Sequence, residues 1–149
     1  GGAWTEWMPF ATLTAWTLPP GDGRKTIEAE FRNARGTTPR SATISLDTVG
    51  PVTRAPYKRS VRKGAYVRLP YRVTDTPPCA AKARVTIKIK TVRGATKKTF
   101  TLGPRRIGSL QSHRFRCLLA KRTYRFFVYA TDAAGNKQRV LGWNYLYVK

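Results

Sequence analysis

Apolar and polar residues alternate along several stretches of the chain, and this period of two constrains the fold more than any other feature. Val85, Ile87 and Ile89 are separated by threonine and lysine. Every second side chain of a β-strand points to the same face, so this pattern is typical of a strand with one buried face. No segment carries the three-and-four spacing of an amphipathic helix. The pattern therefore predicts an all-β fold. Further alternating stretches lie near residues 65–74, 110–118 and 122–131.

The number and spacing of these stretches predict a β-sandwich. Glycine- and proline-containing turn signals separate them about every dozen residues. Seven short strands within one hundred residues are typical of a sandwich of two antiparallel sheets. From Val52 onward we expect strands near residues 52–57, 65–74, 82–92, 96–102, 110–118, 122–131 and 140–148.

A weak internal repeat divides the chain into two modules. Residues 26–36 (TIEAEFRNARG) align with residues 125–135 (RFFVYATDAAG), an offset of 99 positions. In both copies a strand runs into a turn that begins with Asn or Asp and contains glycine. We therefore expect residues 51–149 to form a complete sandwich and residues 1–50 to hold only the C-terminal strands of another. The strands of this partial module are expected near residues 3–10, 13–18, 24–33 and 41–47, and residues 48–56 read as a linker.

The net charge of +22 belongs entirely to the second module. Residues 1–50 contain five basic and five acidic side chains, which leaves 24 basic and two acidic ones for residues 51–149. A field of this strength attracts and steers polyanions whatever the fold.

The N-terminal part resembles the tandem immunoglobulin-like (Ig-like) modules of large secreted or surface proteins of bacteria. The resemblance rests on a tryptophan-rich block, on Gly21-Asp22-Gly23 with Lys25-Thr26, and on Ile44 with Leu46-Asp47-Thr48. The segment 129–136 (YATDAAGN) is similar to the Ig-like or fibronectin-like modules that close such proteins. The tryptophan-rich block comprises Trp4, Trp7, Pro9, Phe10, Ala11, Trp16 and Leu18.

The resemblance implies antiparallel Ig-like β-sandwiches in tandem, the first incomplete on its N-terminal side. It also implies a structural or adhesive role, an extracellular or cell-surface location, and other copies or neighbouring modules of the same protein as partners. Such a chain could be a stalk, or a filament subunit in which strands of a neighbouring chain complete residues 1–50. As members of the family motif, Trp4, Trp7 and Trp16 are expected to pack in the core and at the edge of the module. The alternative is that these indoles are exposed and form a binding interface, where they would stack on the sugars of a carbohydrate.

The sequence shows no catalytic or metal-binding constellation, and we predict neither enzyme activity nor a cofactor. His113 is the only histidine and is expected on the surface of a strand, without a tuned acid–base partner. Asp132 and Asn136 could bind calcium, but the prediction is that Asp132 hydrogen-bonds the backbone of its own turn. Cys79 and Cys117 are predicted to form one buried disulfide; the alternative is two free core thiols.

Outward basic residues on the predicted strands suggest an anion-binding face. Like charges on paired strands lie about 5 Å apart and repel each other unless an anion lies between them. The ligand would be a wall polymer or lipid phosphate, an acidic polysaccharide or, least expected, a nucleic acid, because no helix is available for a groove and no stacking platform stands out. The alternative is a merely solvated face. Phe127 and Tyr129 point outward beside it and could form an interface. The candidate anion-binding residues are Lys82, Arg84, Lys88, Lys90, Arg114, Arg116 and Arg125.

Overall fold

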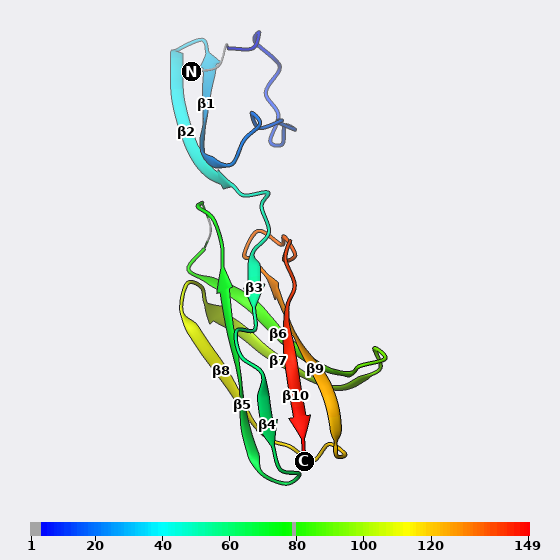
Figure 1. Ribbon diagram of the computed structural model, residues 1–149. Helices are drawn as coiled ribbons and strands as arrows, with labels where there is room; N and C mark the ends of the chain where they lie inside the picture. Colours follow the sequence, from blue (N-terminus) through cyan, green and yellow to red (C-terminus); the bar gives the residue numbers. More distant parts are fainter. Residues whose placement is uncertain (1–3, 79) are drawn as a thin grey trace. The chain divides into compact units, whose positions relative to one another are not determined.

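The computed structural model describes residues 4–78 and 80–149, and these residues form strands and loops without a helix. The chain divides into two compact units, residues 1–46 and 47–149 (Figure 1). This division lies four residues before the predicted one at residue 50, because Asp47 and the residues after it pack with the second unit. Within the described part of the chain, no helix is long and apolar enough to cross a membrane.

The first unit contains a single β-hairpin. β1 (Gly23–Asn33) pairs antiparallel with β2 (Gly36–Leu46), from Gly23 opposite Leu46 to Asn33 opposite Gly36. The turn is closed by the Arg35 amide, which donates a hydrogen bond of 2.8 Å to Asn33 Oδ1. The strands predicted near 24–33 and 41–47 are confirmed, although the second already begins at residue 36. The strands predicted near 3–10 and 13–18 are wrong for the described residues, because residues 4–22 find no strand to pair with.

None of the described residues of the first unit is buried. Trp4, Trp7 and Trp16 are 61%, 50% and 53% exposed, so the predicted packing of the three indoles in the module is wrong for the described chain. A two-stranded sheet offers no second layer against which an apolar face can be covered. The other large apolar side chains left exposed are Met8, Phe10, Leu13, Phe31 and Ile44.

The second unit consists of two sheets that pack in a sandwich-like arrangement. One has the strand order β4-β10-β9-β6-β7 and the other the order β3-β5-β8. Neighbouring strands are antiparallel except β4 and β10, which are parallel. All seven predicted strands are confirmed. β4, a strand of three residues, was missed. The strands are β3 (Val52–Arg54), β4 (Arg59–Val61), β5 (Tyr66–Thr74), β6 (Lys82–Thr91), β7 (Thr96–Arg106), β8 (Leu110–Arg116), β9 (Arg122–Thr131) and β10 (Gly142–Val148).

The core lies between the two sheets and takes every second side chain from the strands on both sides. β5 contributes Leu69 and Val73, which are fully buried. β6, β9 and β10 contribute the facing residues from the other sheet. The alternation seen in the sequence is thus the alternation between the core and solvent. The facing residues include Val85, Ile87, Ile89, Phe126, Val128 and Leu146.

The structure lends no support to the predicted disulfide. Cys117 is a free thiol and is fully buried in the core. Cys79, its predicted partner, lies outside the described residues.

A buried hydroxyl joins the two sheets where β3 meets the start of β10. Thr53 Oγ1 lies 2.7 Å from the carbonyl oxygen of Val128 and 3.1 Å from that of Val140. The same oxygen accepts a 2.7 Å hydrogen bond from the Gly142 amide. The contact is close: a Cβ at Gly142 would lie 2.5 Å from Arg54 Cα. The Thr53 hydroxyl therefore accepts a bond from one backbone amide and offers its single proton to two backbone carbonyls, in a place that is closed to water.

Replacing this hydroxyl by a methyl group should destabilise the second unit. Thr53→Val keeps the shape but leaves buried polar groups unpaired, and we expect a loss of about 1–3 kcal/mol in the free energy of unfolding. Urea unfolding followed by tryptophan fluorescence measures it. The control is Thr99→Val on the exposed side of β7. Equal stability of the two variants would contradict this role for Thr53.

Candidate functional site

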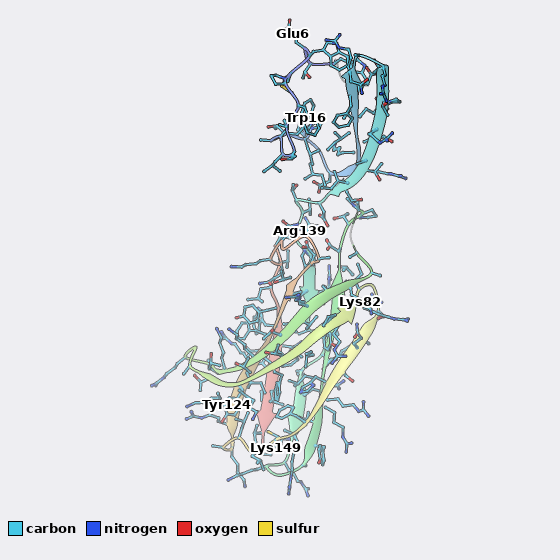
Figure 2. All side chains as sticks on the ribbon, turned by 180° about the vertical axis from the view of Figure 1, so that it is seen from behind. Glu6, Trp16, Lys82, Tyr124, Arg139 and Lys149 are labelled. Atoms are coloured by element: carbon cyan, nitrogen blue, oxygen red, sulfur yellow. The ribbon has the colours of Figure 1, made fainter. Side chains whose placement is uncertain are left out.

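The outer face of the five-stranded sheet gathers cations and aromatic rings. Lys88 lies opposite Phe127, and Lys90 lies opposite Arg125, across the β6–β9 ladder. On the other side of β9, Trp143 is opposite Phe127, and Tyr145 is opposite Arg125. Figure 2 shows the side chains on the ribbon, with Lys82 at the start of β6 pointing away from it. We call this surface the aromatic–cationic face; it comprises Lys88, Lys90, Arg125, Phe127, Tyr129, Trp143, Tyr145 and Tyr147.

Each of the three cations lies over a ring. Lys88 Nζ is 5.2 Å from the centroid of Tyr129, and Lys90 Nζ is 5.3 Å from that of Phe127. Arg125 Cζ is 5.0 Å from the Trp143 ring and 5.7 Å from the Tyr145 ring. Such cation–π contacts attract the charge to the ring quadrupole and hold flexible side chains in place. In addition, Arg125 Nε is buried without a hydrogen-bond partner.

The rings also contact one another in a row along β10. The centroids are 6.2 Å apart for Phe127 and Trp143, 5.4 Å for Trp143 and Tyr145, and 5.9 Å for Tyr145 and Tyr147. Of these, Phe127 was predicted to point outward, and so was Tyr129 nearby. The three aromatic residues of β10 were missed. The signal was present, because in the segment 142–148 (GWNYLYV) the rings alternate with the buried Leu146 and Val148.

The prediction of one basic face is wrong in part, because the seven candidate residues divide between the two sheets. Arg114 and Arg116 belong to β8, which pairs with β5 on the three-stranded sheet. The alternation of a strand shows which side chains leave the core, but not to which sheet the strand belongs. The five residues on the other sheet are Lys82, Arg84, Lys88, Lys90 and Arg125.

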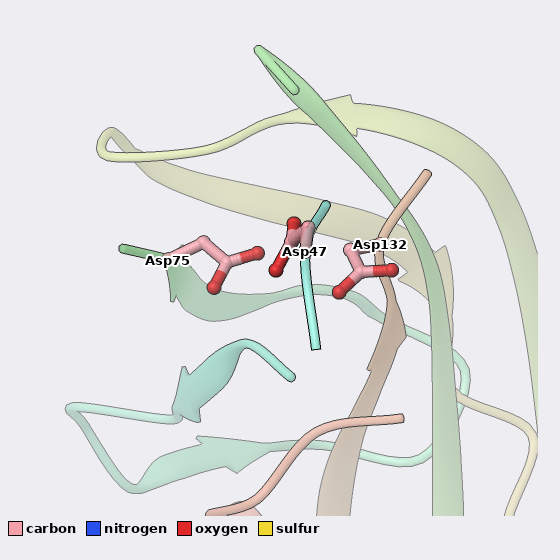
Figure 3. A group of neighbouring side chains, drawn as sticks. All are labelled: Asp47, Asp75 and Asp132. Carbon is pink, nitrogen blue, oxygen red and sulfur yellow. The ribbon is translucent and has the colours of Figure 1, made fainter. Parts of the chain in front are cut away.

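Three carboxylates meet at one end of the second unit. One ligand oxygen from each of Asp47, Asp75 and Asp132 lies within 4.8 Å of the others, and Figure 3 shows the groups side by side. These are the only acidic residues in positions 47–149. Sequence reasoning considered Asp132 alone, because the three residues are far apart in the chain. Carboxylate oxygens are ligands that Ca²⁺ takes, so these are the described residues that could hold a metal.

The hydrogen bonds around Asp132 confirm that its carboxylate shapes its own turn. Asn136 donates from its backbone amide to Oδ1 (2.8 Å) and from its side-chain amide to Oδ2 (3.0 Å). The same side-chain amide donates to the Asp47 carbonyl oxygen at 2.9 Å. Asp132 is 6% exposed, so these bonds satisfy a buried carboxylate.

Within the cluster, the surroundings of Asp75 shift the pKa of its carboxyl group. Burial raises the pKa of its carboxyl group, and the carboxylates of Asp47 and Asp132 raise it further, against the lowering effects of the Thr76 amide and Arg139. Asp75 Oδ2 is buried without a hydrogen-bond partner. Folding therefore makes this carboxyl group easier to protonate than it is in the unfolded chain.

His113 was predicted to lie on the surface of a strand, and this prediction is wrong. Its ring packs toward the core, 4.4 Å from the centroid of Phe100, and its Nε2 is buried without a partner. Burial, and then the charge of Arg105, lower the pKa of the imidazole. Its neighbours are thus phenyl rings and a cation.

Removing the Asp75 charge should stabilise the second unit at neutral pH. The pKa of Asp75 is higher in the folded state than the value of 3.8 expected in the unfolded chain. The carboxyl group therefore contributes its full stabilising effect below pH 3.8, and this contribution is lost as the pH rises through the folded-state pKa. At pH 7 we expect Asp75→Asn to unfold at a higher urea concentration than the wild type. The gain in the free energy of unfolding should be less than about 1 kcal/mol, because the group is partly exposed. Below pH 3.8 the difference should vanish.

Urea titrations at both pH values in the presence of a chelator measure the effect of Asp75→Asn. Asp22→Asn in the first unit is the control. A difference between wild type and Asp75→Asn that is the same at both pH values would contradict the electrostatic cause.

No protein-family model matches the chain, and no curated protein matches it. The function is therefore inferred from the geometry and the charge of the molecule.

Proposed function

We propose that residues 47–149 are a non-catalytic Ig-like adhesive module of an exported bacterial protein, and that the module binds an anionic polymer through its aromatic–cationic face. The module would act outside the cell or at its surface. The observation that carries the proposal is the set of three cations, Lys88, Lys90 and Arg125, held over aromatic rings on one sheet face.

The charges of this face lack acidic partners nearby. The three carboxylates of residues 47–149 are gathered in the cluster at one end of the unit. Arg125 lies seven residues before Asp132, which corresponds to about 20 Å along an extended strand. Lys90 and Arg125 face each other directly across the ladder, an arrangement that costs free energy unless an anion is shared between them.

The rings prepare the cations for binding. A lysine or arginine side chain loses rotamer freedom when it binds a ligand, and this loss weakens affinity. Here contact with Tyr129, Phe127 and Trp143 already restricts the three side chains.

The same contacts favour an acidic polysaccharide or wall polymer over a nucleic acid. Single-stranded nucleic acids gain much of their affinity by stacking bases on free aromatic rings. On this face cations lie over Phe127, Tyr129 and Trp143 and cover part of these rings, so a ligand meets charges beside tyrosine side chains and a Trp143 ring that is 44% exposed. Those groups suit carboxylates, sulfates and sugar hydroxyls.

Neutralising the three cations should weaken binding to heparin, used as the probe. We expect the triple variant Lys88→Gln, Lys90→Gln, Arg125→Gln to bind more weakly and to lower the slope of log affinity against log salt by about 2–3. Calorimetric titrations at several salt concentrations measure both quantities.

The matched control removes three exposed charges elsewhere, in Arg93→Gln, Lys97→Gln, Lys121→Gln. An equal loss in the control would mean that net charge alone attracts heparin and would overturn the proposal. Tighter binding of single-stranded DNA than of heparin at the same salt concentration would refute the polysaccharide assignment.

A second candidate function, self-assembly by strand addition, is favoured by the first unit. Its hairpin has no buried residue in the described range, and its large apolar side chains are exposed. A sheet of two strands is at best marginally stable in water. Strands from another copy of the chain would pair with its open edges and cover Phe10, Leu13 and Phe31.

Assembly predicts an oligomer that depends on these apolar side chains. We expect the intact chain to sediment as an oligomer and Phe10→Ser, Leu13→Ser, Phe31→Ser to shift the association midpoint to about tenfold higher concentration or more. Thr37→Ser, Thr38→Ser is the control. A monomer whose residues 4–46 resist proteolysis would exclude strand addition.

A further inference from the structure

An open groove lies on the other side of the second unit from the aromatic–cationic face. It has a volume of about 710 Å³ and is lined by residues of β4, β5 and β8. Three of the five lining residues are arginines, and none is acidic. We call it the arginine groove; it comprises Arg59, Tyr66, Val67, Arg68 and Arg114.

The strand register places two of these arginines directly opposite each other. Arg68 on β5 pairs with Arg114 on β8, and both side chains are exposed on the outer face of the sheet. Side chains in this position lie about 5 Å apart at Cβ, and like charges there are destabilising. An anion between the two guanidinium groups would turn this repulsion into attraction.

The groove is partly fixed in shape. The guanidinium of Arg114 lies over the ring of Tyr66, with Cζ 4.1 Å from its centroid. Arg59 donates from Nε to the carbonyl oxygen of Arg68 at 3.2 Å, and its Cζ lies 5.8 Å from the centroid of Tyr57. These contacts hold two of the three guanidinium groups and leave most of their N–H donors free for a ligand.

No acidic side chain of the second unit lines this groove. The acidic residues of positions 47–149 are Asp47, Asp75 and Asp132, which lie together in their own cluster. Arg68 is seven residues from Asp75 along β5, about 20 Å of extended chain. An anion in the groove must therefore come from outside the unit.

We propose that the arginine groove binds a tetrahedral oxyanion, the phosphate or sulfate group of an ester ligand. The planar guanidinium fork donates two parallel hydrogen bonds to neighbouring oxygens of such a group, which a lysine cannot do. All three cations that line the groove are arginines. Because the groove is open to solvent, it also leaves space for a group attached to the anion. This site lies outside the aromatic–cationic face and stands whether or not that face binds a polymer.

Inorganic phosphate is the first probe, and the arginine Nε–H signals of the full chain are the readout. At constant ionic strength we expect a saturable shift of the Arg59 and Arg114 signals with phosphate and with sulfate, and none with acetate. The variant Arg68→Lys, Arg114→Lys keeps the charge but loses the fork, and it should bind phosphate about tenfold more weakly. The control Arg93→Lys, Arg122→Lys should bind like the wild type.

The outcomes separate this proposal from the preceding one. The variant Lys88→Gln, Lys90→Gln, Arg125→Gln should retain phosphate binding in the groove. Glucose 6-phosphate and vesicles containing phosphatidylglycerol then distinguish a soluble sugar ester from a lipid headgroup as the source of the anion. Linear, unsaturable shifts in the wild type, or full affinity in Arg68→Lys, Arg114→Lys, would overturn the arginine groove as a site.

Discussion

Burial of every second side chain between two sheets is the constraint on which the second unit depends. Ile87, Phe126 and Leu146 enter the core from one sheet and Leu69 and Val73 from the other. Because successive side chains of a strand point to opposite faces, this burial also determines which residues point outward. The cations of β6 and the rings of β10 are at the surface as a direct result. The residues of the candidate sites are thus the outward-pointing residues of the same strands whose inward-pointing residues form the core.

The shortage of acidic residues gives these outer faces their character. Most proteins intersperse both signs of charge, whereas here the few carboxylates of the second unit are used together at one end. The outward cations make cation–π contacts with aromatic rings in place of ion pairs with carboxylates. Examples are Lys90 over Phe127 and Arg114 over Tyr66. Rings orient a cation without neutralising it. A surface built in this way keeps its attraction for external anions, which is the common basis of both binding proposals.

A comparison of the two units shows that an alternating pattern forms strands but does not by itself bury their apolar side chains. β1 carries the same alternation as its counterpart β9, and both strands end in a turn closed by an Asn or Asp side chain. Phe126 of β9 is fully buried, whereas Ile27 at the matching position of β1 is only half-buried. The difference is the second sheet, which β9 has beneath it and the hairpin lacks. The exposed tryptophans of the first unit follow from this missing layer and motivate the proposal of strand addition.

The sequence by itself determined the all-β class, seven of the eight strands of the second unit and the identity of their buried residues, because these follow from local alternation and turn chemistry. It also placed Asp132 in its turn, since that hydrogen bond is local. The surface position expected for His113 went against the local pattern, because His113 shares its strand face with Phe115. Only the tertiary structure decided which strands are neighbours, because pairing depends on long-range packing that leaves no periodic trace in the chain. This is why Arg114 was assigned to the wrong face and why the convergence of Asp47 and Asp75 on Asp132 was missed. The arginine groove, formed by three separate strands, belongs to the same class of features.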